Sequence, residues 1–206
     1  MVGCINTFRN HADVDASAYE PFGMYLRFSQ ETTNQIASML HEAYPTYEQY
    51  LRPRDGHGIT LIRCADMTRI MQEQQVGVTA FFEALRSLPR DSIWTPPLPP
   101  FMSTSKHGKT HIGVNLQPTE EYLLYIKQIQ TALAGVGLFA TFSDKPHITL
   151  GTFRDNTPRE VSKKIKAKVY SSVTKGSLFR PKCSHLQVGA GYVKPHPLFL
   201  QMLERS

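Results

Sequence analysis

Long hydrophobic runs and paired cysteines are missing from this sequence of 206 residues. Without a run of about 18 apolar residues, no transmembrane helix is expected. The N-terminal MVGCINTFRNHADVD has no apolar core of the kind that signal peptides carry. The three cysteines are an odd number without paired spacing, which argues against a disulfide framework and a zinc ribbon. We therefore expect a cytoplasmic, intracellular protein that does not bind a membrane.

Several short catalytic motifs are absent as well. The sequence contains no glycine-rich phosphate loop, no HExxH, no CxxC and no GxSxG. These absences argue against a P-loop nucleotidase, a zinc protease and a serine hydrolase with a nucleophile elbow. Hydrophobic residues make up 41% of the chain and charged residues 19%, which is typical of a globular protein. We expect a loose lead-in over 1–21 and a single two-lobed domain over 22–206.

Acidic residues are scarce in one segment, 157–182. It holds eight Lys or Arg and one acid, Glu160, and its net charge of +7 exceeds the +6 of the whole chain. Such a concentrated positive patch fits a phosphate-bearing partner, but it is equally typical of a solvated helix face. Ile165 and Val169 lie four residues apart, so they form the expected buried stripe of a basic helix on the outside of the fold.

Hydrophobic periodicity predicts alternating strands and helices along the rest of the chain. Four prolines between 96 and 100 exclude a helix interior and a central strand, and they predict a long irregular loop over 89–108. Strands are expected over 22–28, 56–64, 110–116, 138–142, 145–153 and 184–193. Helices are expected over 30–44, 65–88 with a break near Gly77, 118–134 and 160–173, and 197–204 is a short helix or strand.

Two parts of this pattern repeat each other. In each, a strand and a helix precede a strand that carries His, Thr and Leu: His57-Gly-Ile-Thr60-Leu in the first part and His147-Ile-Thr149-Leu in the second. Such a repeat predicts an α+β fold with pseudo-two-fold symmetry and both motifs in one cleft.

The second motif has a spacing that brings two reactive groups together. Residues i and i+2 of a strand share a face, so His147 and Thr149 point the same way while Ile148 and Leu150 pack behind them. An imidazole beside a hydroxyl provides a proton-transfer group and a hydrogen-bond donor for an anionic oxygen. Two such pairs facing each other would hold one phosphate.

The KPHITL segment, its partner motif and the two strand–helix units resemble the two-histidine, LigT-like phosphoesterase superfamily over about 22–195. The resemblance implies a bilobed fold in which two largely antiparallel sheets form a central cleft with helices outside. It also implies cleavage without metal or cofactor of a 2′,3′-cyclic, 2′–5′ or cyclic-oligonucleotide phosphodiester. His57, Thr60, His147 and Thr149 would be catalytic, and the substrate would be a nucleotide, a cyclic nucleotide or RNA bound by a monomer.

The first motif departs from the family pattern, because two residues rather than one separate His57 from Thr60. A β-bulge at Gly58 would return both side chains to one face. Alternatively the motif is degenerate and Thr60 acts alone, in which case the protein binds RNA or a nucleotide without cleaving it. A third interpretation is an interaction module that uses only its basic helix.

Four further residues are expected to contact substrate. Lys145 precedes His147 by two residues and so shares its face. Tyr192, Trp94 and Phe101 are aromatic and would stack on a base, the last two from the proline-rich loop. A core position for Tyr192, and a loop anchored by its own aromatic residues, are the alternatives.

Overall fold

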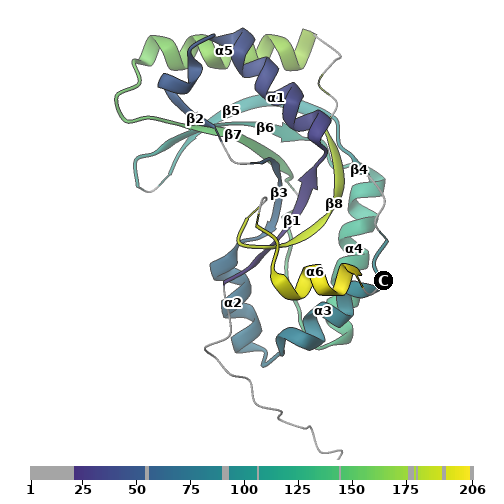
Figure 1. Ribbon diagram of the computed structural model, residues 1–206. Coiled ribbons are helices and arrows are strands. Elements are labelled where there is room, and N and C mark those ends of the chain that lie inside the picture. The colour runs from purple at the N-terminus through teal and green to yellow at the C-terminus, as the bar shows by residue number, and fades with distance from the viewer. Residues whose placement is uncertain are drawn as a thin grey trace, which may run out of the picture.

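Two four-stranded antiparallel sheets form the centre of the molecule in the computed structural model, with the helices outside them (Figure 1). The expected α+β class and two-sheet architecture are confirmed. The structure describes residues 21–53, 56–89, 93–105, 107–143, 145–175, 179, 181–191 and 194–204. The expected lead-in therefore lies almost wholly outside the described residues.

Each sheet contains one of the two motif threonines, Thr60 on β3 and Thr149 on β7. The first sheet has the order β3-β1-β8-β4, and the second has the order β2-β7-β6-β5. In the first sheet the strands are β3 (Gly58–Ile62), β1 (Gly23–Phe28), β8 (Lys182–Gly189) and β4 (Ile93–Trp94). In the second they are β2 (Leu51–Pro53), β7 (His147–Phe153), β6 (Thr110–Leu116) and β5 (Pro97–Thr104).

The helices cover the outer faces of both sheets. Helices α1 and α5 lie side by side over the second sheet, whereas α2, α3, α4 and α6 surround the first (Figure 1). Their bounds are α1 (Gln30–Ala43), α2 (Cys64–Glu73), α3 (Val78–Arg86), α4 (Glu120–Gly135), α5 (Arg159–Lys175) and α6 (Pro197–Glu204), and a 3₁₀ turn, η2, spans Tyr47–Gln49. Among the described helices, none is long and apolar enough to cross a bilayer.

Local sequence explains where the helices begin and end. The Ser29 hydroxyl accepts a hydrogen bond from the backbone N–H of Thr32 at the start of α1, and the Thr119 hydroxyl accepts one from Tyr122 at the start of α4. The expected break near Gly77 separates α2 from α3. On α5, Ile165 and Val169 are fully buried, as predicted, and the helix packs against β5 and α1 on the outside of the second sheet.

Two expectations about local structure are wrong. Residues 97–104 form β5 instead of an irregular loop, and its prolines are accommodated because β5 is an edge strand whose pairing shifts register between Pro97 and Pro100. Residues 138–142 form no strand and instead belong to the extended connection between α4 and β7. Both errors arise from tertiary placement, which local propensity does not encode.

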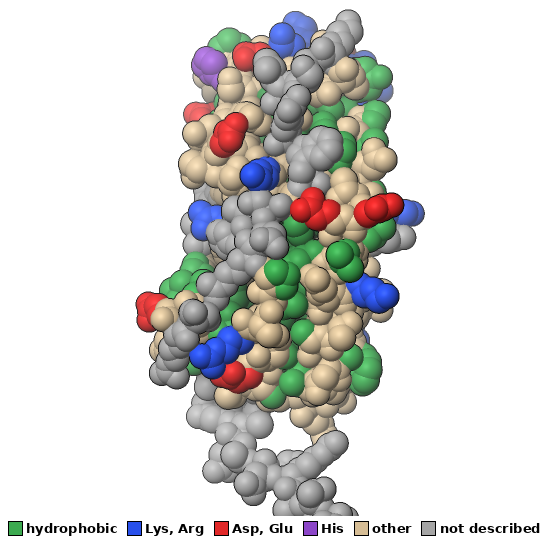
Figure 2. Space-filling view, turned by 90° about the vertical axis from the view of Figure 1, so that its right-hand side faces the viewer, with side chains coloured by type: hydrophobic (Ala, Val, Ile, Leu, Met, Phe, Trp, Pro, Cys, Tyr) green, Lys and Arg blue, Asp and Glu red, His purple; other side chains and the backbone are tan. Residues whose placement is uncertain are grey.

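The face that carries α4 in Figure 1 has interspersed acidic and basic side chains with hydrophobic ones between them (Figure 2).

Two thiols among the described residues, Cys64 and Cys183, are free. Burial raises the pKa of the Cys183 thiol, which keeps it protonated and unreactive.

Gly113 on β6 allows an unusually close approach of neighbouring groups. A Cβ atom at this position would lie 2.5 Å from the carbonyl oxygen of Ile148 and 2.5 Å from the ring of Phe101. Because the Ile148 oxygen belongs to the neighbouring strand, it cannot move without disturbing the β6–β7 pairing.

We predict that Gly113→Ala lowers the free energy of unfolding by roughly 1–3 kcal/mol, the usual cost of overpacking. Gly135→Ala is the matched control, because nothing lies within 4 Å of the added methyl group. Urea unfolding of both variants measures the difference. Equal stability of the two variants would contradict the close packing at Gly113.

Candidate functional site

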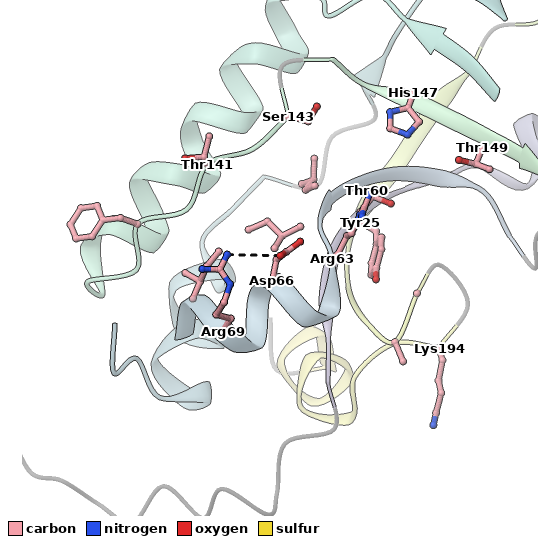
Figure 3. A pocket seen from close by; sticks show the side chains of 16 residues that line it. Tyr25, Thr60, Arg63, Asp66, Arg69, Thr141, Ser143, His147, Thr149 and Lys194 are labelled. Atoms are coloured by element: carbon pink, nitrogen blue, oxygen red, sulfur yellow. Dashed lines mark ion pairs between the residues drawn. The ribbon is translucent and has the colours of Figure 1, made fainter. Parts of the chain in front are cut away.

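A cavity of about 1110 Å³ contains the threonines of both motifs but only one of the two histidines (Figure 3). Its walls come from β1, β3, α2, the 139–143 connection, β7 and the turn after β8. The side chains that line it and carry polar groups are Tyr25, Thr60, Arg63, Asp66, Arg69, Thr141, Ser143, His147, Thr149 and Lys194.

The second motif has the predicted geometry. Ile148 and Leu150 are fully buried, while His147 is exposed, Thr149 is half-buried and both line the cavity. The alternation follows directly from the two-residue period of the strand. The expectation that His147 and Thr149 share one face is therefore confirmed.

Two contacts orient the His147 ring. Its Nδ1 lies 3.4 Å from the carbonyl oxygen of Lys145, and the ring of Phe101 meets it edge-on with centroids 5.6 Å apart. Phe101 on β5 pairs with Gly113 on β6. Because Gly113 has no side chain, the Phe101 ring can extend over it to reach His147. Since a carbonyl only accepts, a hydrogen bond at this contact requires the hydrogen on Nδ1, and that tautomer of a neutral His147 has its lone pair on Nε2.

Both motif strands contain a β-bulge at the same place. On β3, Met24 pairs with Ile62 and Tyr25 with Thr60, so Leu61 is the extra residue. On β7, Ile112 pairs with Gly151 and Gly113 with Thr149, so Leu150 is the extra residue. In both strands the bulged residue is the leucine that follows the motif threonine. The structural repeat therefore aligns Thr60 with Thr149 and, two residues earlier, Gly58 with His147.

The bulge expected at Gly58 is absent. Pairing with β1 runs regularly from Thr60 back through Ile59 and Gly58, and the Phe28 backbone N–H donates to the His57 carbonyl at 3.0 Å. His57 thus lies on the face opposite Thr60, together with Ile59, and its side chain is only 6% exposed. The expectation that His57 and Thr60 share a face is wrong, because the β-bulge of β3 lies after Thr60, at Leu61, and not before it, at Gly58.

Several cavity residues were not identified from the sequence. Arg63, Arg69 and Lys194 supply three positive charges to the lining, and Asp66 supplies one negative charge. Asp66 and Arg69 are 3.9 Å apart on one face of α2 (Figure 3), and Arg69 also contacts Glu73 at 3.2 Å. These pairs are more than half exposed and contribute little to stability. Their net effect is a lining that attracts anions.

Tyr25 forms the floor of the cavity beside Thr60. The two residues are direct cross-strand partners, so they share a face of the first sheet. The Tyr25 hydroxyl lies 3.3 Å from the Cys64 sulfur and passes over Gly23, where a Cβ atom would come within 2.7 Å of it. The phenol hydroxyl therefore lies close to β1 at Gly23 and to the start of α2 at Cys64.

Phe139 is an exposed aromatic side chain at the rim. It is 69% exposed and yet lines the cavity. Its backbone is held by the side-chain amide of Gln74 at the end of α2: the Phe139 N–H donates to Oε1 at 2.6 Å, and Nε2 donates to the Phe139 carbonyl at 2.9 Å. This two-point pairing fixes the connection that carries the ring, although the connection has no regular secondary structure.

The four residues expected to contact substrate have different positions. The Lys145 side chain is exposed and does not line the cavity, and Phe101 supports His147 instead of capping the cleft. Trp94 lies on β4, where its backbone pairs with that of Lys182 on β8, and its side chain lies outside the described part of the chain. Tyr192 also lies outside the described residues.

Part of the missed set had a detectable signal. Arg63 follows the first motif by three residues, and Asp66 and Arg69 lie within the helix that comes next, so a search of the segment after each motif strand would find them. Lys194 and Phe139 come from irregular connections, whose course the sequence pattern does not predict.

No protein-family profile and no curated protein sequence matches this chain. Among solved structures, Usb1 from Kluyveromyces marxianus is similar with a TM-score of 0.44 and 11% sequence identity, over 85% of this chain and 98% of that one. The structure of Kluyveromyces marxianus Usb1 with uridine monophosphate gives a TM-score of 0.45 at 11% identity, over 85% of this chain and 99% of that one. Similarity at this level assigns neither a residue role nor an activity to the present chain.

Proposed function

We propose that the cavity binds the phosphodiester of a nucleotide or RNA and that His147 promotes its cleavage without a metal ion. The observation that supports this most directly is the convergence of one imidazole and two threonine hydroxyls on a single cavity whose other charged groups are mainly basic. Hydroxyl and cationic donors stabilise the charge that develops on non-bridging oxygens, while the imidazole exchanges a proton with the reacting oxygen.

Each group has a distinct part in this proposal. Thr60 and Thr149 approach from opposite sheets, so each would donate to one non-bridging oxygen of a phosphate held between them. Arg63 and Lys194 add positive charge along the wall formed by the first sheet. Phe101 and the Lys145 carbonyl keep the His147 ring aimed into the cavity.

The substrate class is a 2′,3′-cyclic, 2′–5′ or cyclic-oligonucleotide phosphodiester. At about 1110 Å³, the cavity is slightly larger than ordinary ligand pockets, which leaves space for more than one nucleoside. Phe139 offers an exposed ring at the rim on which a flanking base would stack.

A second candidate function is binding of RNA or a nucleotide without turnover. The observation that favours it is Gly58, which occupies the place in β3 that His147 occupies in β7. The two functions share every binding contact and differ in whether product forms when a 2′,3′-cyclic nucleotide, a 2′–5′ oligoadenylate and a cyclic dinucleotide are incubated with the protein and a chelator.

His147→Ala should reduce kcat/KM by roughly 10²–10⁴-fold, the usual effect of losing a general acid or base. Thr149→Ala should cost less, about 10²-fold, whereas Thr149→Ser should retain most activity because it keeps the hydroxyl. His41→Ala is the matched control, since His41 lies exposed near the end of α1. Full activity in His147→Ala would contradict the proposed role, and loss of wild-type activity in a chelator would indicate a metal ion instead.

Phe139→Ala should weaken binding of an oligonucleotide by roughly 5–150-fold, which corresponds to the 1–3 kcal/mol that stacking on one base contributes. A mononucleotide that does not reach the rim should bind equally well to both proteins, and Phe139→Tyr should behave as wild type. Gln74→Ala should show part of the effect, because it frees the backbone of Phe139. Equal oligonucleotide affinity in Phe139→Ala and wild type, measured by fluorescence anisotropy, would remove the rim from the binding site.

Replacing Lys163, Lys164, Lys166 and Lys168 with Gln tests the basic helix. Since α5 packs outside the second sheet, the variant should bind long RNA more weakly and with a flatter salt dependence, because fewer counterions are released. Turnover of a mononucleotide-sized substrate should be unchanged. An equal loss for the small substrate would mean that α5 borders the cavity, and no change for either would leave these lysines as a solvated face.

A further inference from the structure

The two motif strands are structurally equivalent, and this equivalence determines which positions can supply an imidazole to the cavity. Counting back from the bulge at Leu61 gives Thr60, Ile59 and Gly58, and counting back from the bulge at Leu150 gives Thr149, Ile148 and His147. The first strand thus has a glycine where the second has its histidine. His57 lies one residue further on, and a one-residue offset in a strand reverses the side-chain direction.

The surroundings of His57 agree with this reversal. The pairing of β1 with β3 puts Leu26, Phe28 and Ile59 on the same face as His57, and these residues are 1%, 2% and 1% exposed. The cross-strand partner of Gly58 is Arg27, which is half-buried and is not one of the residues that line the cavity. A guanidinium group stabilises negative charge but does not exchange protons near neutral pH.

We propose that His147 is the single proton-transferring imidazole of this site and that it works as a general base through Nε2. The proposal rests on the proposed function and deepens it. Because Nδ1 donates to the Lys145 carbonyl, neutral His147 presents the Nε2 lone pair to the cavity. A partner imidazole that must stay protonated is missing from the equivalent position on β3.

The chemical step balances with water as the only other reactant. Nε2 takes a proton from the attacking water molecule, the new O–P bond forms, and the bond between phosphorus and the leaving oxygen breaks. The leaving oxygen takes a proton from a water molecule in the open cavity, and the hydroxide so formed takes the proton from the imidazolium. Thr60, Thr149 and the basic lining residues stabilise the charge on the phosphoryl oxygens during this step.

This arrangement has a characteristic pH dependence. Activity requires neutral His147, so kcat/KM is low in acid, rises through one inflection and then stays level. Two imidazoles acting as acid and base would instead give a bell-shaped profile with two inflections. The other ionisable side chains that line the cavity are Tyr25, Arg63, Asp66, Arg69 and Lys194. None of these five side chains is an imidazole.

The test combines kinetics and NMR on the full chain. We expect one inflection in the pH profile of wild type with a 2′,3′-cyclic nucleotide in a chelator. His57→Leu and His57→Gln should keep kcat/KM within about threefold and the same profile, whereas His147→Ala should lose roughly 10²–10⁴-fold. Two substitutions of different polarity guard against a loss of folding at this buried position, and circular dichroism checks each.

NMR provides a readout that does not require turnover. The imidazole signals of His57 and His147, assigned by comparison with His57→Gln and His147→Gln, are followed during titration with 3′-UMP. We expect saturable shifts for His147 alone. A bell-shaped profile that loses its alkaline limb in both His57 variants, or shifts of His57 that saturate together with those of His147, would overturn the single-imidazole proposal while leaving the phosphodiesterase function intact. Binding of 3′-UMP with a shift of His147 alone, but no product from any substrate, would overturn the phosphodiesterase function and support the assignment of one imidazole to the cavity.

Discussion

The approach of β3 and β7 across the cavity is the constraint on which the rest of the site depends. Each strand has one face packed against a hydrophobic layer, so the direction of every side chain follows from its distance to the bulge at Leu61 or Leu150. The threonines satisfy this constraint on both strands and meet in the same cavity. The histidines satisfy it on only one strand. His147 therefore lines the cavity. His57, one residue away from the equivalent position on the other strand, is buried instead.

The second half of the molecule also shows how a small residue positions a large one. Gly113 leaves the row between Phe101 and Thr149 free of side chains, and the Phe101 ring occupies that space and supports His147. In the first half, Tyr25 occupies the row that Gly113 occupies in the second. The two sheets have equivalent backbones but form different walls of the cavity. The wall from the second sheet orients the His147 imidazole, and the wall from the first sheet presents the Tyr25 phenol and basic side chains.

Sequence reasoning predicted those features that local chemistry determines. The buried stripe on α5 and the face shared by His147 and Thr149 both follow from short-range spacing. The register of the first motif could not be predicted in this way. His57 is adjacent to Gly58, the position equivalent to His147, and the sequence alone does not show which of the two residues faces the cavity. The prolines of β5 were misread since an edge strand and a loop have the same composition, and only the neighbouring strand distinguishes them. Lys194 and Phe139 depend on the course of irregular connections and had no periodic signal.

The strand order has a consequence for how the molecule folds. Along the chain, β1 and β3 enter the first sheet with β2 between them in the second, and β8 returns to the first sheet after β5, β6 and β7 have completed the second. Helix α1 follows a strand of the first sheet but packs against α5, which covers the second. Neither sheet is therefore built from one continuous segment, so neither half can be cut out as an autonomous folding unit. Most of the pairings also close long stretches of chain, which corresponds to a high contact order and slow, concerted folding.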